Sequence, residues 1–325
     1  MSSTVMRIRD FRVAFDVPGG RLRAVDGVDL DLRRGEILAI VGESGSGKSA
    51  LSMGLVGLNR GPRTRISGTV EFGGRNLVEA SEAQLREVRG RDVAVVFQDA
   101  LAALNPLHRA GAQVAEMVRL HQPVSRAAAW ERAERLLDDV GIASPASAAR
   151  AYPHQLSGGM RQRVMIAMGL ANDPAVLIAD EPTTALDVTI QAQVLALLKA
   201  LQAEHDTSIV LITHDLGVVA EVADRVAVMY AGRIVEQGTR EEVLERPRHP
   251  YTVGLLRSVP RIDGPLDEQL AAIPGSPLTG LDRPDGCAFA PRCTFTTEAC
   301  AEVPELLPRA GGGHLDACVL PESLR

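Results

Sequence analysis

The feature that most constrains the fold of this chain is a glycine-rich segment, Gly42-Glu-Ser-Gly-Ser-Gly-Lys48-Ser49. It follows an apolar stretch from Glu36 to Val41 and opens a helical pattern from Lys48 to Leu58. A loop of this composition between a strand and a helix lets backbone N–H groups close on phosphates, while Lys48 and the Ser49 hydroxyl serve phosphate and Mg²⁺. The predicted phosphate-binding residues are Gly42, Glu43, Ser44, Gly45, Ser46, Gly47, Lys48 and Ser49.

Apolar β-branched segments alternate with helical patterns along the chain, which predicts an α/β fold with a mostly parallel sheet. Further strands are expected at 93–97, 176–179, 208–212 and 225–230. Residues 5–32 alternate about a turn at Pro18-Gly19-Gly20 and predict an antiparallel β subdomain. Apolar stripes at 113–121 and 126–140 predict a helical subdomain over about residues 100–170.

Composition excludes some classes of protein. Hydrophobic residues make up 46% of the 325 residues, and the net charge of −6 offers no basic surface for nucleic acid. No apolar run approaches the roughly 20 residues that a membrane helix needs, and residues 1–10 carry charges instead of a signal sequence. We expect a cytoplasmic chain that reaches a membrane only through another protein.

A second motif, Val176-Leu-Ile-Ala-Asp180-Glu181, leads an apolar strand into two carboxylates. In nucleotide hydrolases the aspartate of such a pair holds Mg²⁺, and a neighbouring carboxylate orients or deprotonates the attacking water. Gln98 and His214 also follow predicted strands. Sheets of this class bind ligands at the carboxyl ends of their strands, which favours His214 over His205, because His205 precedes its strand.

In this order the motifs resemble those of the ATP-binding-cassette (ABC) ATPases, over roughly residues 5–245. Leu156-Ser157-Gly158-Gly159-Met160 is similar to the signature motif of that family, and residues 180–187 to its Walker B motif and D-loop. The resemblance implies that Gln98 is the Q-loop residue and His214 the switch histidine. Phe15 lies where the family places an adenine-stacking aromatic, although a core position suits a phenylalanine almost equally well.

The resemblance also implies a role for each site residue. Glu181 would be the general base and His214 would contact the γ-phosphate, and with Gln98 they form the expected catalytic set. Magnesium is attended by Ser49, Gln98 and Asp180. ATP is bound by the phosphate loop and, from a second subunit, by the signature residues Ser157, Gly158 and Gly159, with the D-loop residue Asp187. Two half-sites must therefore meet before either one hydrolyses ATP.

The C-terminal part of the chain resembles a particular subfamily. After Glu245 the composition shifts toward Pro, Gly and Cys, so we predict a nucleotide-binding domain at 1–245 and an extension at 246–325. The segment from Arg246 to Pro260, which contains His249-Pro250-Tyr251-Thr252, is similar to the extension of ATPases that power oligopeptide, dipeptide and nickel importers. The implied function is ATP hydrolysis that drives import of peptides, with nickel or another small solute as the alternative substrate.

The implied partners are a second, similar ATPase in a heterodimer, two membrane permease subunits and an extracellular solute-binding protein. The chain would then lie at the cytoplasmic face of the inner membrane. A soluble ABC ATPase acting on nucleic acid or the ribosome is the alternative. That class predicts tandem cassettes, a long coiled-coil insertion or a basic face, and the sequence contains none of these.

All four cysteines, Cys287, Cys293, Cys300 and Cys318, lie in the extension. Disulfides are disfavoured in a reducing cytosol, and the close Cys pairs typical of structural zinc are absent. Four thiolates with looser spacing can hold an iron–sulfur cluster. The Gly286-Cys287-x-Phe289-x-x-Arg292-Cys293 pattern resembles that of cluster-bearing peptide-importer ATPases. A [4Fe-4S] cluster is the favoured expectation, with zinc and no metal left open.

Overall fold

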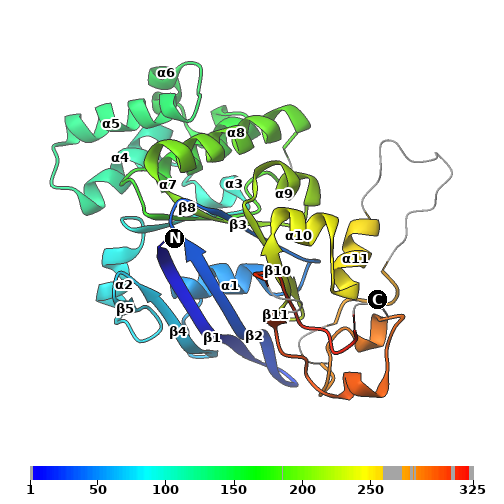
Figure 1. The fold of residues 1–325 in the computed structure, drawn as a ribbon. Coiled ribbons are helices and arrows are strands. Elements are labelled where there is room, and N and C mark those ends of the chain that lie inside the picture. Colours follow the sequence, from blue (N-terminus) through cyan, green and yellow to red (C-terminus); the bar gives the residue numbers. More distant parts are fainter. Residues whose placement is uncertain are drawn as a thin grey trace. The chain divides into compact units, whose positions relative to one another are not determined.

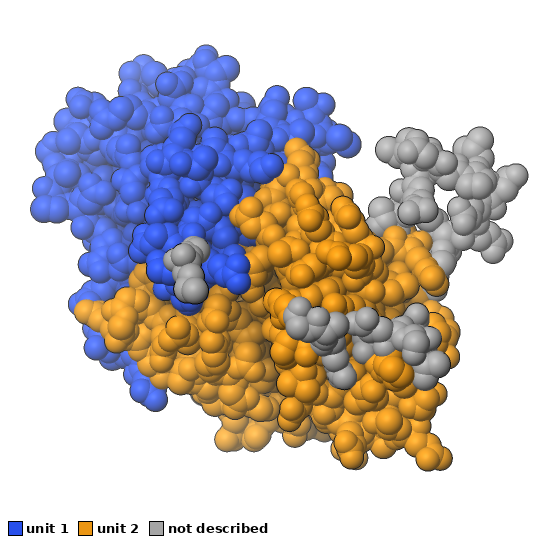
Figure 2. Space-filling model, viewed as in Figure 1, with its two compact units in different colours: residues 1–5, 32–37, 79–212 blue, residues 6–31, 38–78, 213–325 orange. Residues whose placement is uncertain are grey.

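The computed structural model describes residues 3–184, 186–258, 273–278, 281, 283–308 and 312–321. The chain divides into two compact units, which Figure 2 distinguishes by colour. Unit 1 comprises Met1–Val5, Leu32–Ile37 and Glu79–Ile212. Unit 2 comprises Met6–Asp31, Leu38–Val78 and Thr213–Arg325. The phosphate loop and the cysteine-containing extension thus belong to the same unit.

An antiparallel sheet accounts for the N-terminal part of unit 2 (Figure 1). Its strands, in the order β2-β1-β4-β5, are Gly20–Arg33, Thr4–Val17, Thr64–Phe72 and Arg75–Asn76. Alternation places Ile8 opposite Val70 and Val13 opposite Ile66. Ile8, Val13 and Val70 are buried, so this alternation supplies the inner face of the sheet. The antiparallel subdomain predicted from residues 5–32 is confirmed, whereas β4 and β5 were not predicted.

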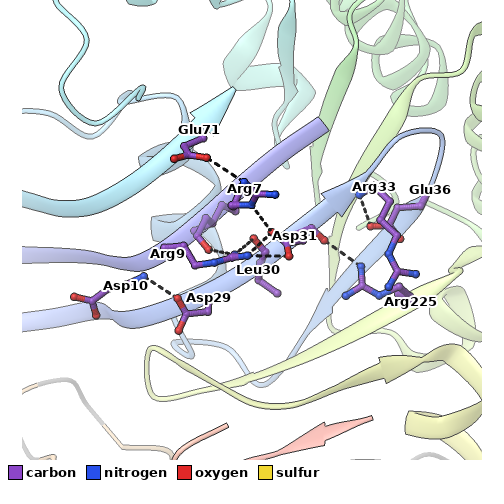
Figure 3. Close-up of polar contacts among 11 residues, drawn as sticks. Arg7, Arg9, Asp10, Asp29, Leu30, Asp31, Arg33, Glu36, Glu71 and Arg225 are labelled. Atoms are coloured by element: carbon purple, nitrogen blue, oxygen red, sulfur yellow. Dashed lines mark hydrogen bonds and ion pairs between the residues drawn. The ribbon is translucent and has the colours of Figure 1, made fainter. Parts of the chain in front are cut away.

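The intervening positions of this sheet carry charged side chains, several of which pair across the strands (Figure 3). Arg9 Nη2 lies 2.8 Å from Asp31 Oδ1, and Arg7 Nη1 lies 3.5 Å from Glu71 Oε2. All four side chains are more than a third exposed, so each pair contributes little to stability. Their effect is to keep this face of the sheet solvated.

The other strands of unit 2 form its core with the C-terminal extension. Strand β3 (Ile37–Val41) runs parallel to β9 (Arg225–Tyr230), and β10 (Arg233–Thr239) is antiparallel to β9. The short strands β12 (Leu315–Asp316) and β11 (Leu307–Pro308) continue beyond β10. The buried cluster contains Val41, Val228 and Tyr230 together with Tyr251 and Phe289 of the extension. The extension is therefore part of this hydrophobic core.

The helices of unit 2 are short and connect these strands. They are α1 (Lys48–Leu55), α9 (Leu216–Val222), α10 (Arg240–Glu245), α11 (Pro250–Arg257) and the 3₁₀ turns η2 (Ala290–Arg292) and η3 (Glu298–Ala301). Helix α1 begins at Lys48, as the sequence predicted, and ends at Leu55 before the predicted Leu58. Thr239 and Glu242 form a capping box that starts α10 directly after β10.

Unit 1 contains a parallel sheet and a group of helices. Strand β7 (Val176–Asp180) pairs in parallel with β6 (Val93–Val96) and with β8 (Ser208–Thr213). Every residue of β7 is buried, which explains its continuous apolar sequence. The predicted strands at 93–97, 176–179 and 208–212 are confirmed to within one residue at each end. With the parallel pairing of β3 and β9, they bear out the α/β assignment.

Helices follow these strands and fill most of unit 1. They are α2 (Glu82–Val88), α3 (Ala100–Ala103), α4 (Ala110–His121), α5 (Arg126–Asp139), α6 (Pro145–Arg150), η1 (Pro153–Gln155), α7 (Gly158–Gly169) and α8 (Val188–His205). Helices α4, α5 and α6 pack on one another (Figure 1). Helices α3 to α7 occupy the stretch with the predicted helical pattern. None of the helices in the described part of the chain is both long and apolar enough to cross a membrane.

Candidate active site

Two glycines of the phosphate loop are required by close backbone contacts. A Cβ at Gly42 would lie 2.1 Å from the Met229 carbonyl oxygen, and one at Gly47 would lie 2.1 Å from the Ala24 carbonyl oxygen. Gly47 also has a φ of 106°, in the left-handed region that glycine adopts without strain. The loop thus lies in close contact with the backbones of β9 and β2, and only glycine fits at these two positions.

The side chains of the loop are arranged for an anion. Lys48 is 5% exposed, and its Nζ donates to the carbonyl oxygens of Gly42 at 2.8 Å and Glu43 at 3.0 Å. Ser46 is 4% exposed, and its Oγ has no hydrogen-bond partner among the described residues. Ser49 is exposed in the first turn of α1. A narrow loop, a folded-back ammonium group, an unsatisfied hydroxyl and a helix N-terminus together suit the phosphates of a nucleotide and a magnesium ion.

At the end of β7, the structure brings together two of the predicted catalytic residues. Asp180 is the last residue of the strand and is 4% exposed. Glu181 turns away with a φ of 48°, and its N–H donates to the Ile212 carbonyl oxygen at 2.8 Å. Its Oε2 accepts hydrogen bonds from Gln98 Nε2 at 3.0 Å and from Thr184 Oγ1 at 2.8 Å. The carboxylate is therefore oriented by two donors, of which the sequence reasoning missed Thr184.

A helix N-terminus is exposed at the signature motif. The Ser157 hydroxyl caps α7 by accepting from the Met160 N–H at 3.2 Å, and Ser157 and Gly158 are exposed. A Cβ at Gly159 would lie 2.8 Å from Ile190 Cγ2 of α8, so the missing side chain lets the two helices approach. Asp187 caps α8 by accepting from the Ile190 N–H at 3.0 Å. The signature motif and the D-loop residue thus start neighbouring helices.

The predicted site residues are divided between the two units. Unit 1 contains Gln98, Asp180, Glu181, Ser157, Gly158, Gly159 and Asp187. Unit 2 contains Phe15, the phosphate loop and His214. Phe15 is half-buried on β1 opposite Thr64, outside the core that Phe11 enters. His214 is exposed directly after β8. Their assembly into one site stays a prediction.

The four cysteines line one small cavity of about 10 Å³ in unit 2. None of the four described cysteines forms a disulfide bond, and Cys300 and Cys318 are buried. Burial raises the pKa of the Cys287 thiol, and the neighbouring Cys300 and Cys318 raise it further. The Phe295 N–H donates to Cys293 Sγ at 3.4 Å. No group of three or more His, Cys, Asp or Glu side chains among the described residues is arranged to hold a metal ion, so this geometry does not support the expected cluster.

Family models match two parts of the chain. One described as ABC transporter matches residues 25–184, and one described as Oligopeptide/dipeptide transporter, C-terminal region, matches residues 235–300. Among solved structures, a dimeric post-hydrolysis state of the ATP-binding cassette MJ0796 bound to ADP and Pi is 27% identical and has a TM-score of 0.66, covering 72% of this chain and 98% of that one. The structure of cbiO1 from Clostridium perfringens is 28% identical with a TM-score of 0.62, covering 75% and 91%.

Similar proteins extend over nearly the whole sequence. The oligopeptide transport ATP-binding protein OppD of Bacillus subtilis is 51% identical, covering 90% of this chain and 82% of that protein. OppD of Escherichia coli is 46% identical, covering 98% of this chain and 94% of that protein. The dipeptide transport ATP-binding protein DppD of B. subtilis is 48% identical, covering 92% of this chain and 89% of that protein. The chain therefore belongs to the ATP-binding proteins of the ABC transporter family that carry the oligopeptide/dipeptide transporter C-terminal region.

Proposed function

We propose that this chain binds and hydrolyses ATP to power the import of dipeptides or oligopeptides through an ABC transporter. The observation that carries the hydrolytic role is the Glu181 carboxylate, held by Gln98 and Thr184 beside Asp180 at the end of β7. The peptide substrate is supported by similarity to proteins named for oligopeptide and dipeptide transport. This similarity includes the C-terminal region, matched at residues 235–300.

The residues of unit 2 bind the nucleotide in this proposal. Backbone N–H groups of the phosphate loop and the Lys48 ammonium group receive the phosphates, while the Phe15 ring stacks on adenine. His214 contacts the γ-phosphate. Ser49 would hold Mg²⁺ together with Gln98 and Asp180, and the bound ion would neutralise charge on the phosphate oxygens.

The residues of unit 1 act on the attacking water. Glu181 Oε2 accepts a proton from a water aligned with the γ-phosphate, and the hydrogen bonds from Gln98 and Thr184 keep this carboxylate in place. Removing such a base typically lowers turnover by about 10²–10⁴-fold. The γ-phosphoryl group is transferred to water, so the products are ADP and phosphate.

A dimer would supply the remaining contacts. The exposed N-terminus of α7, capped by Ser157 and followed by Gly158 and Gly159, offers backbone N–H groups to an anion. We place there the γ-phosphate of ATP held by the phosphate loop of a second subunit. Asp187 lies near the N-terminus of α7, because Gly159 of α7 contacts Ile190 in the first turn of α8. The second subunit is expected to be a similar ATPase in a heterodimer.

The assembly we propose contains two permease subunits and an extracellular solute-binding protein, with this chain bound peripherally at the cytoplasmic face of the inner membrane. Co-purification of the chain from membranes tests these partners. Uptake of a labelled tripeptide into vesicles should require ATP, and Lys48→Ala should abolish that uptake without dissociating the complex. ATP-dependent uptake of Ni²⁺ with no uptake of peptide would contradict the proposed substrate.

We further propose that Cys287, Cys293, Cys300 and Cys318 hold a [4Fe-4S] cluster, with zinc as the alternative. Support comes from four cysteines that line one cavity without forming disulfide bonds, and from the Phe295 N–H that donates to Cys293 Sγ. Protein purified without oxygen should absorb near about 400 nm and contain iron. A colourless preparation with stoichiometric zinc would show that the site holds zinc and not the cluster, and a metal-free preparation would exclude both metals.

A further inference from the structure

The phosphate loop is held by the C-terminal extension through the side chain of Glu43. Arg292 Nη1 lies 2.6 Å from Glu43 Oε2, and Arg292 Nη2 lies 3.1 Å from Glu43 Oε1. The Arg292 side chain is 3% exposed and that of Glu43 is 25% exposed. A bidentate pair of this kind, largely removed from water, fixes geometry more firmly than a surface ion pair does.

The backbone of Glu43 is held from the extension as well. Its N–H donates to the Tyr251 hydroxyl at 2.8 Å, and Tyr251 is fully buried. The Tyr251 ring packs against Tyr230 and Phe289, with ring centroids 4.6 and 5.4 Å away. Burial raises the pKa of the Tyr251 phenol, so the hydroxyl stays protonated. Both the side chain and the amide of residue 43 are therefore fixed by rigid groups outside the loop.

Arg292 is itself positioned by segment 287–293, which begins at Cys287 and ends at Cys293. It ends the turn η2, and the Cys293 N–H donates to the Ala290 carbonyl oxygen at 3.2 Å across this turn. Arg292 Nε donates to the Pro274 carbonyl oxygen at 2.8 Å, and the guanidinium carbon lies 5.8 Å from the centroid of the Tyr230 ring. A guanidinium group with all these neighbours has little freedom to follow a moving loop.

The contacts of Glu43 with the extension affect the nucleotide site in two ways. An unpaired Glu43 carboxylate would repel the phosphates that the loop binds, and Arg292 neutralises it. The Lys48 ammonium group donates to the Glu43 carbonyl oxygen at 3.0 Å, so the position of residue 43 also determines where the phosphate-binding charge lies. The link thus runs from the extension through Glu43 to Lys48.

We infer that Arg292 and Tyr251 are positioning residues of the phosphate loop, through which segment 287–293 of the extension sets the affinity for ATP. This inference rests on the proposed ATP binding, and it assigns the extension a role in nucleotide binding.

The test measures binding of MgATP to the full-length protein and its variants. Arg292→Gln should weaken binding about tenfold, because it leaves the Glu43 carboxylate partly buried and unpaired. In a Glu43→Gln background, the same substitution should change affinity by no more than about twofold, since the charge it would expose is gone. Effects of the two substitutions that simply multiply would refute the inference.

Matched controls separate this role from a general loss of structure. Arg283→Gln removes another largely buried arginine of the extension, whose Nη1 pairs with Asp26 of β2 at 2.7 Å. It should lower the unfolding temperature without weakening ATP binding. Two further variants test the positioning role directly.

Tyr251→Phe removes only the hydroxyl that holds the Glu43 N–H and should also weaken ATP binding. In the assembled transporter, Arg292→Lys should bind ATP more tightly than Arg292→Gln does, and Arg292→Gln should raise KM for ATP far more than it lowers kcat.

The outcomes distinguish the two proposals. Wild-type protein that binds no ATP would contradict the proposed function itself. If wild-type protein binds ATP and Arg292→Gln and Tyr251→Phe bind equally well, the positioning role is wrong and the proposed function stands. Equal losses of affinity in Arg283→Gln and Arg292→Gln would also overturn it, because the effect would then be a general one.

Discussion

Replacing Gly47 by alanine tests whether close backbone contacts, and not the left-handed conformation alone, require glycine in the phosphate loop. Gly45 provides a matched comparison, because it too has a positive φ, of 81°, but a Cβ there would meet nothing within 4 Å. At Gly47 a Cβ would lie 2.1 Å from the Ala24 carbonyl oxygen, so the backbone must shift by about 1 Å to reach an allowed contact distance. The two substitutions share the conformational strain and differ in this collision.

The magnitudes follow from these contacts. Left-handed backbone costs an alanine roughly 1–2 kcal/mol, offset by about 0.4–1 kcal/mol from the reduced entropy of the unfolded chain. Overpacking against a neighbour typically adds about 1–3 kcal/mol. Gly45→Ala should therefore cost about 1 kcal/mol and Gly47→Ala about 3 kcal/mol. For a protein of this size the difference corresponds to a gap of roughly 3 °C between the melting temperatures.

The assay is calorimetry of the full-length protein without nucleotide, so that altered ATP binding does not enter the comparison. MgATP is then added to each variant, and Gly47→Ala should gain less thermal stabilisation than wild type, since its loop is displaced. If Gly45→Ala lowers the melting temperature as much as Gly47→Ala does, positive φ alone explains the glycines and the contact with the Ala24 carbonyl plays no part.

Three further predictions concern catalysis, assembly and pH. Glu181→Gln should keep ATP binding, lower turnover at least about 100-fold and accumulate a closed dimer in gel filtration; near-normal turnover would remove Glu181 as the base. Ser157→Ala should impair the ATP site of the partner subunit. A mixed dimer with a subunit mutated at Lys48 should therefore keep one intact site and part of its ATPase activity, whereas in-chain catalysis would leave neither site intact. Burial raises the pKa of Asp26, but the hydrogen bond from Arg233 and the charges of its arginine neighbours outweigh this effect and leave it below the ordinary 3.8. The carboxylate thus stabilises the fold above pH 3.8 and loses that effect as the pH falls through its folded pKa. Asp26→Asn should therefore lower the free energy of unfolding by about 3 kcal/mol at pH 7 and by progressively less in acid. Chemical unfolding at a series of pH values measures this difference.

Much of the fold could be predicted because its signals are local. The buried strands β6, β7 and β8 are short apolar segments, and the phosphate loop announces both the strand before it and the helix after it. Strands β4 and β5 gave no comparable signal. β4 reads Thr-Arg-Ile-Ser-Gly-Thr-Val-Glu-Phe, with one fully buried residue, and becomes a strand by pairing with β1. Its conformation depends on a partner more than 40 residues earlier in the sequence.

The site shows the same division. The residues of the phosphate loop, the signature motif and the Walker B strand could be identified because each set is contiguous and its chemistry depends on local backbone geometry. The contact between Gln98 and Glu181 was foreseeable from their shared position at strand ends. Arg292 was noticed only as part of a cysteine motif, because no pattern in a sequence relates it to a glutamate 249 positions away.

By itself, the sequence indicated a phosphate-binding loop, a strand that ends in two carboxylates and a signature helix, and it predicted that this helix acts together with a second subunit. Short-range backbone geometry dictates those features. Only the tertiary structure placed Tyr251 and Arg292 of the extension against Glu43, because a buried core shared by β3, β9 and the extension brings these distant segments together.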